Sequence, residues 1–132
     1  MQPTKNLLAP KTLLLLALSY TLLISIAFLV PGRSMPSMEL PIDKFVHVSI
    51  HAGLLFIWAL YFFRKQKNTI ATKTFSLVAI FCLLYGIIIE ALQEAFVALR
   101  HSDVLDLVAN AVGLLLGGIV FYKVIAYLKN QN

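Results

Sequence analysis

Residues 75–92 read FSLVAIFCLLYGIIIEAL, a run in which Glu90 is the only charged residue. The hydrocarbon core of a bilayer is about 30 Å thick and is crossed by about 20 helical residues, so this stretch is long enough to span a membrane. A charged side chain within such a helix costs about 2.5–3.5 kcal/mol on insertion scales, which makes it rare and often functional. The run therefore indicates a membrane helix and, at Glu90, a candidate site.

The composition of the whole chain also indicates a membrane protein. Its 132 residues are 60% hydrophobic and 13% charged, whereas a soluble domain is about 45–50% apolar and about 25% charged. The net charge of +5 does not indicate nucleic-acid binding, because the basic residues flank apolar segments instead of forming a stripe. The single cysteine, Cys82, excludes an intramolecular disulfide and a four-cysteine metal site.

Three further apolar stretches accompany the first. The four predict an all-α integral membrane four-helix bundle, formed by a single domain over residues 1–132. The expected spans are residues 13–30, 45–63, 75–92 and 104–128. The first is too long for a signal peptide and is followed by no A-x-A cleavage site, so we expect it to be retained.

The basic residues are unequally divided between the two ends of these spans. Eight of the eleven lysines and arginines lie in the N-terminal arm, the loop between the second and third spans, and the C-terminal end. Because cytoplasmic segments carry an excess of such residues, both termini are predicted to be cytoplasmic. All six acidic residues then fall in the outer half of the protein. We expect a multi-pass protein of the cell membrane.

Polar stripes occur at the outer ends of the second, third and fourth spans. Residues three or four apart lie on one face of a helix, and pointing such a face at lipid would be costly. We therefore expect the three stripes to converge on one site. They are Asp43, His47 and His51 on the second span, Glu90, Gln93 and Glu94 on the third, and Asp103, Asp106, Asn110, Gly113 and Gly117 on the fourth.

Structural roles explain some of these residues. Glu39, Asp43 and Glu94 lie near the expected interface, where a solvated carboxylate needs no function. His51 is deeper, and a hydrogen bond in helix packing accounts for it. The two glycines of the fourth span make a flat surface that another backbone can approach closely. Function is the preferred interpretation for His47, Glu90, Arg100 and Asp106.

Two blocks of these residues resemble a known family. Asp43-Lys44-x-x-His47 is similar to the D-K-x-x-H block of VanZ-like membrane proteins. A second block resembles the E-x-x-Q…R…D…N-x-x-G pattern of the same family, and the two blocks cover about residues 40–120. The second block consists of Glu90, Gln93, Arg100, Asp103, Asp106, Asn110, Gly113 and Gly117.

The resemblance implies a membrane domain with a polar pocket. The family is named for a glycopeptide (teicoplanin) resistance protein of Gram-positive bacteria. VanZ-like proteins have been grouped with helical membrane enzymes thought to act on phospholipid and polyprenol-linked head groups. The implied partners are membrane lipids or lipid-linked cell-wall precursors, and not nucleic acid. Nothing in the sequence indicates an oligomeric state.

The residue types suit a phosphate-containing head group. Arg100 can grip a phosphate through two parallel hydrogen bonds, and Lys44 can place a point charge beside it. His47, oriented by Asp106, can transfer a proton or attack phosphorus, and Glu90 can act as general acid or base. The expected catalytic residues are His47, Glu90 and Asp106, and the expected substrate-binding residues are Asp43, Lys44, Gln93, Arg100, Asp103 and Asn110.

The leading hypothesis is a lipid head-group transferase or hydrolase at the outer leaflet, working without a cofactor. A divalent ion could be held by His47, Glu90, Asp103 and Asp106, but no span carries a closely spaced motif such as H-E-x-x-H. Lys44 and Arg100 would also repel a cation. No metal is therefore expected, although a phosphate-bridged Mg²⁺ is left open. The alternatives are a non-catalytic protein that binds or shields wall precursors or glycopeptide antibiotics, and a purely structural partner.

Overall fold

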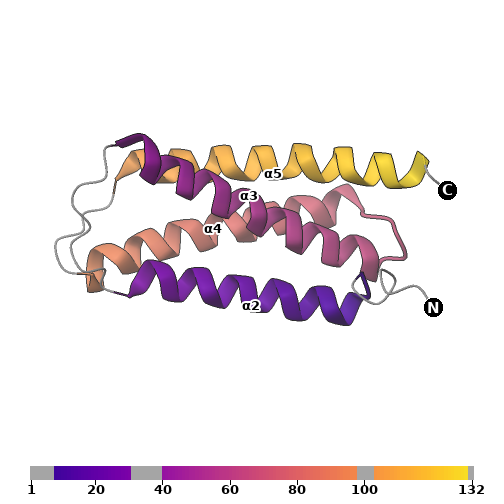
Figure 1. Ribbon diagram of the computed structural model, residues 1–132, viewed down its shortest axis with the longest axis horizontal. Coiled ribbons are helices and arrows are strands. Elements are labelled where there is room, and N and C mark those ends of the chain that lie inside the picture. Colours follow the sequence, from indigo (N-terminus) through magenta and orange to yellow (C-terminus); the bar gives the residue numbers. More distant parts are fainter. Residues whose placement is uncertain (1–7, 31–39, 98–102, 131–132) are drawn as a thin grey trace.

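The computed structural model describes residues 8–30, 40–97 and 103–130. Its four helices are α2 (Pro10–Leu29), α3 (Leu40–Lys65), α4 (Thr72–Phe96) and α5 (Val104–Asn130), and they run alternately up and down one bundle (Figure 1). All four are long and apolar enough to cross a membrane. The expectation of an all-α membrane four-helix bundle is confirmed.

Each helix is longer than the apolar run that predicted it. The helix α3 begins before the expected second span, so Asp43 and Lys44 lie in its first turns. The helix α4 likewise continues beyond the expected third span. Hydropathy marks only the part of a helix that crosses hydrocarbon, whereas the helix itself continues until its backbone groups find other partners. At the start of α2, Pro10 occupies the first turn, where its fixed φ angle and missing N–H are tolerated.

The helix α3 is central to the bundle. It packs most extensively against α5 and also contacts α2 and α4. Within the described ranges, no Cα atom of α2 lies within 8 Å of one in α5. Because α3 and α5 each carry a long polar stripe, their packing brings those two stripes together.

Two glycines allow α5 to approach α3 closely. A Cβ atom at Gly113 would collide with the carbonyl oxygen of Val48, and one at Gly117 with the carbonyl oxygen of Ala52. Both obstacles are backbone atoms of α3, which cannot rotate aside as a side chain can. The close approach expected from these two glycines is therefore confirmed.

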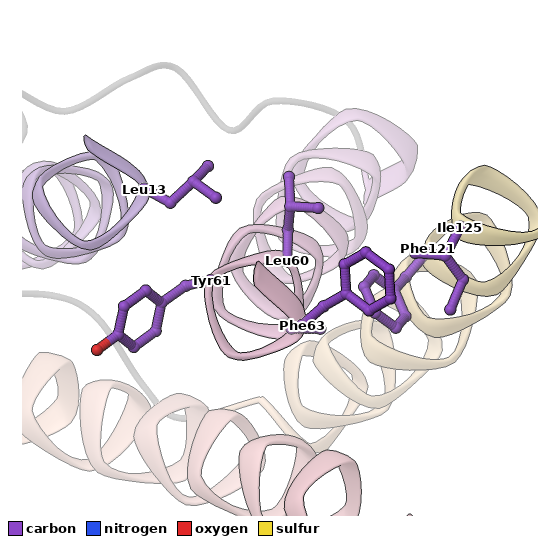
Figure 2. Packing of buried hydrophobic residues seen from close by; sticks show 7 residues of the cluster. Leu13, Leu60, Tyr61, Phe63, Phe121 and Ile125 are labelled. Carbon is purple, nitrogen blue, oxygen red and sulfur yellow. The ribbon is translucent and has the colours of Figure 1, made fainter. Parts of the chain in front are cut away.

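Apolar packing fills the end of the bundle opposite the polar stripes of α3, α4 and α5. Phe63 of α3 and Phe121 of α5 meet edge to face, with ring centroids 6.1 Å apart. Leu13 of α2 and Ile125 of α5 belong to the same cluster (Figure 2). Large apolar side chains such as Leu15 are exposed on the outside of the bundle, which is typical of a surface that faces lipid.

The start of α2, the connection from α3 to α4 and the end of α5 lie at the same end of the bundle (Figure 1). Seven of the eight basic residues that predict a cytoplasmic side lie in or next to these segments, and Lys5 is outside the described residues. The fold therefore brings these seven to one end, as the positive-inside rule expects of a cytoplasmic face.

We predict that this basic end faces the cytoplasm. In a Cys82→Ala background, a cysteine at Thr69 should react with a membrane-impermeant maleimide only after permeabilisation, and a cysteine at Ser102 should react in intact cells. Thr69 is exposed in the α3–α4 connection. It is preferable to Asn68, whose φ of 64° would be strained in a cysteine. The reverse labelling pattern would contradict this orientation.

Candidate functional site

Polar side chains of α3, α4 and α5 meet at the end of the bundle opposite the cluster in Figure 2. His47, Glu90 and Asp106 are 1%, 4% and 3% exposed. Each comes from a different helix, and both carboxylates approach the imidazole of His47. The geometry therefore agrees with the expected convergence for these three residues, none of which faces lipid.

His47 lies at the centre of the cluster. Its Nδ1 is 3.0 Å from Oδ1 of Asn110 and 3.5 Å from Oε1 of Glu90. Because Oδ1 of Asn110 only accepts hydrogen bonds, Nδ1 donates to it, and Nε2 is the ring nitrogen that can offer a lone pair. Nε2 lies 3.8 Å from Oδ1 of Asp43 and 3.8 Å from Oδ1 of Asp106. Asn110 thus orients the ring so that Nε2 is directed toward two carboxylates.

Asp106 has a different partner from the one the sequence predicts. Its separation of 3.8 Å from Nε2 of His47 is too long for the orienting hydrogen bond that was expected. Instead, the Lys44 ammonium donates hydrogen bonds to Asp106 and, over 2.8 Å, to Oδ2 of Asp103. Oδ2 of Asp43 is 3.4 Å away. Lys44 is therefore surrounded by carboxylates, which makes it a weaker phosphate-binding group than the sequence suggests.

Asp103 both pairs with Lys44 and caps α5. Its Oδ1 accepts a hydrogen bond from the N–H of Leu105 at 2.9 Å, the contact that an N-cap residue makes. The hydrogen bond from Lys44 holds the pKa of Asp103 below its usual value of 3.8, and the N–H of Leu105 acts in the same direction. The stabilisation of the folded protein by these two hydrogen bonds to the Asp103 carboxylate is thus fully present above pH 3.8. It is lost as the pH falls through the lowered pKa of Asp103.

The first span supplies a residue that the sequence does not predict. The ring of Phe28 in α2 stacks on His47 with centroids 5.1 Å apart. Its carbonyl oxygen accepts a hydrogen bond of 2.9 Å from Nε2 of Gln93. Gln93, which the sequence assigns to substrate binding, therefore joins α4 to the end of α2. Phe28 lies in an ordinary apolar run, so nothing in its sequence context marks it.

His51 lies one turn deeper than His47. Its Nδ1 is 3.0 Å from the carbonyl oxygen of His47 and donates to it within α3, which fits the expected packing role. The ring fits against α4 because position 86 is glycine. A Cβ atom at Gly86 would lie 2.9 Å from Nε2 of His51 and 3.1 Å from Nδ2 of Asn110. Gly86 thus shapes the site, and the spacing of polar residues alone does not reveal it.

Some predicted residues lie at the edge of the site or beyond the described ranges. Arg100 and Glu39 are outside the described residues, so the anion clamp at Arg100 stays a prediction. Glu94 is exposed on α4, in agreement with a solvated carboxylate. The side chain of Asp43 is 40% exposed, yet it contacts both Lys44 and His47.

Apolar cavities lie away from the polar cluster. One of about 310 Å³ lies between α2, α3 and α4, and another lies mainly between α4 and α5. Neither is lined by His47, Glu90 or Asp106. The connections from α2 to α3 and from α4 to α5 are outside the described residues, so the expected polar pocket stays a prediction. Residues that line the first cavity include Leu54, Trp58, Phe81, Cys82 and Tyr85.

No family model, curated protein or solved structure matches this chain. The candidate site therefore rests on its own geometry and on the resemblance of the two sequence blocks to VanZ-like proteins.

Proposed function

We propose that this chain is a VanZ-like protein of the cell membrane that acts on phosphate-containing lipid head groups at the outer leaflet, by head-group transfer or hydrolysis. The observation that carries the proposal is the buried contact between His47 of α3 and Glu90 of α4. Ionisable groups are expensive inside a membrane protein. Both imidazole and carboxylate groups can also act in general acid–base catalysis.

The depth of this pair suits a head group better than an acyl chain. His47 lies about 10 Å from the start of α3, and Glu90 about 10 Å from the end of α4, at a rise of 1.5 Å per residue. Head-group regions add about 5–8 Å to each side of the hydrocarbon core. The pair therefore lies close to one membrane surface, and the distribution of basic residues predicts that this is the outer one.

In the proposed reaction Glu90 exchanges a proton with the reacting oxygen of the substrate. Asn110 holds Nδ1 of His47, and Glu90 lies beside the same nitrogen. Arg100 grips the phosphate with its planar guanidinium group. The charged groups beside the phosphate are the Lys44 ammonium and its three carboxylate partners, Asp43, Asp103 and Asp106. A protein that only binds or shields a lipid precursor would use the same residues without proton transfer.

Glu90→Gln should abolish turnover while preserving lipid binding. The substitution keeps the side-chain shape and removes the ionisable group, and general acid–base catalysis contributes about 10²–10⁴-fold to rate. We expect the variant to be at least about 100-fold slower. The measurement is mass spectrometry of membrane lipids from cells that express the wild type, the variant or neither protein, together with lipids that copurify with each protein.

Glu94→Gln provides the matched control. Glu94 lies one turn further along α4 and is exposed, so its substitution should leave the lipid profile of the wild type unchanged. Loss of both binding and phenotype in Glu90→Gln would favour the binding protein over the enzyme. A lipid profile that is the same for Glu90→Gln and wild type would remove Glu90 from the mechanism.

A further inference from the structure

The described site holds more negative than positive charge. Three carboxylates converge on the Lys44 ammonium, and a fourth approaches His47. A phosphate placed beside these four carboxylates would be repelled unless positive charge, from Arg100 or from a bound cation, lay next to it. Divalent cations commonly carry that charge at phosphate sites.

Three of these side chains present donor atoms to one point. Asp43, His47 and Asp106 each offer one donor atom, and these three atoms all lie within 4.8 Å of one another. Nε2 of His47 is 3.8 Å from Oδ1 of Asp43 and 3.8 Å from Oδ1 of Asp106. Around an octahedral cation with bonds of about 2.1 Å, donor atoms lie about 3–4 Å apart. Small side-chain movements therefore complete three positions of such a coordination shell.

The lone pair of His47 supports a cation independently of the acids. His47 is 1% exposed, and its Nδ1 proton is directed to Oδ1 of Asn110. Among the described residues, Nε2 has no hydrogen-bond partner. A lone pair directed toward two carboxylate oxygens is unfavourable unless a positive charge lies between them. Metal-binding histidines donate their other ring N–H to an oxygen acceptor in this same way.

Lys44 competes for this position. Its ammonium contacts Asp106 and lies 3.4 Å from Oδ2 of Asp43. The Lys44 side chain is 23% exposed, so its flexible stem can withdraw toward the membrane surface. We propose that Asp43, His47 and Asp106 bind a divalent cation of the Mg²⁺ or Mn²⁺ class, which displaces the ammonium. That the cation bridges to a lipid phosphate rests on the proposed function, whereas its binding does not.

The test uses the full chain in a maltoside micelle, which contains no phosphate, and Mn²⁺ as the probe. Electron paramagnetic resonance should show Mn²⁺ binding that Mg²⁺ competes away. Asp43→Asn should weaken the affinity on the order of tenfold or more, as loss of a ligand-shell contact does. Glu94→Gln removes the same charge from an exposed position on α4 and should change the affinity less than about twofold. Absence of binding, or equal effects of the two substitutions, would overturn the proposal.

The Lys44→Met variant tests, through its thermal stability, whether the cation displaces the ammonium. With no ammonium to displace, Mn²⁺ should raise the melting temperature of this variant more than that of the wild type. An equal or smaller rise would contradict displacement of Lys44. If the wild type does not bind Mn²⁺ and the Glu90→Gln variant is inactive, the cation site is rejected and the proposed function stands. If the wild type binds Mn²⁺ and the Glu90→Gln variant is fully active, the cation site stands and the proposed role of Glu90 is rejected.

Discussion

Gly117→Ala should destabilise the bundle by about 1–3 kcal/mol, the usual cost of overpacking, even though alanine is the better helix former. The new Cβ atom would meet the carbonyl oxygen of Ala52, and the Cα atom of Ala52 lies only 2.9 Å from its position. Because both atoms belong to the α3 backbone, the helices must separate. The separation would also draw Asn110 and Asp106 of α5 away from α3.

Gly118→Ala is the matched control on the same helix. Its Cβ atom would lie 3.3 Å from Cζ of Phe75 and 3.6 Å from Cδ2 of Leu55, which are ends of side chains that can adjust. Alanine gains up to about 1 kcal/mol of helix propensity over glycine, so this variant should be as stable as the wild type or more so. Unfolding by dodecyl sulfate in mixed micelles, followed by circular dichroism, measures both variants. Equal stabilities would show that the α3–α5 approach does not depend on Gly117.

Lys44→Met should destabilise the protein by about 2–3 kcal/mol. The value lies between about 0.2–1 kcal/mol for exposed ion pairs and about 3–5 kcal/mol for breaking a buried pair. The intermediate value follows from the burial of the partners. The Asp106 side chain is only 5% exposed, whereas the side chains of Lys44 and Asp103 are 23% and 40% exposed. Methionine keeps the apolar stem but leaves the Asp106 carboxylate without its ammonium partner.

Adding Asp106→Asn to Lys44→Met should restore most of this stability, because the uncompensated buried charge is then removed. Lys129→Met, at an exposed position in the last turn of α5, should change stability by less than about 0.5 kcal/mol. The same dodecyl sulfate titration measures all three proteins. If the double variant is no more stable than Lys44→Met, the loss comes from the lysine stem and not from the unpaired charge.

Secondary structure and the candidate residues could be predicted because each depends on local sequence. Apolar runs of sufficient length must form helices in lipid, where every backbone group needs an internal partner. A 3.6-residue period then assigns polar residues to faces, which is why His47, Glu90 and Asp106 could be grouped before their contacts were known. The helix ends were less well predicted, since hydropathy does not mark where Asp43 and Lys44 join α3.

Partner choice within the site could not be predicted in the same way. Asp106 and Asn110 lie on one face of α5, and either could have oriented His47. The register between α3 and α5 decides between them, and that register is set where Gly113 and Gly117 meet the carbonyl groups of Val48 and Ala52. The pattern of residues along a single helix contains no information about the register between two helices.

The sequence by itself determined four membrane-length helices, their polar faces and the residues able to carry charge, because these follow from local hydrophobicity and helical period. Only the tertiary structure decided that Asn110 holds His47, that three aspartates surround Lys44, and that Phe28 of the first span closes over the imidazole. Those contacts join residues far apart in the chain. They depend on helix register and on distances of a few ångströms, which spacing along one helix does not specify.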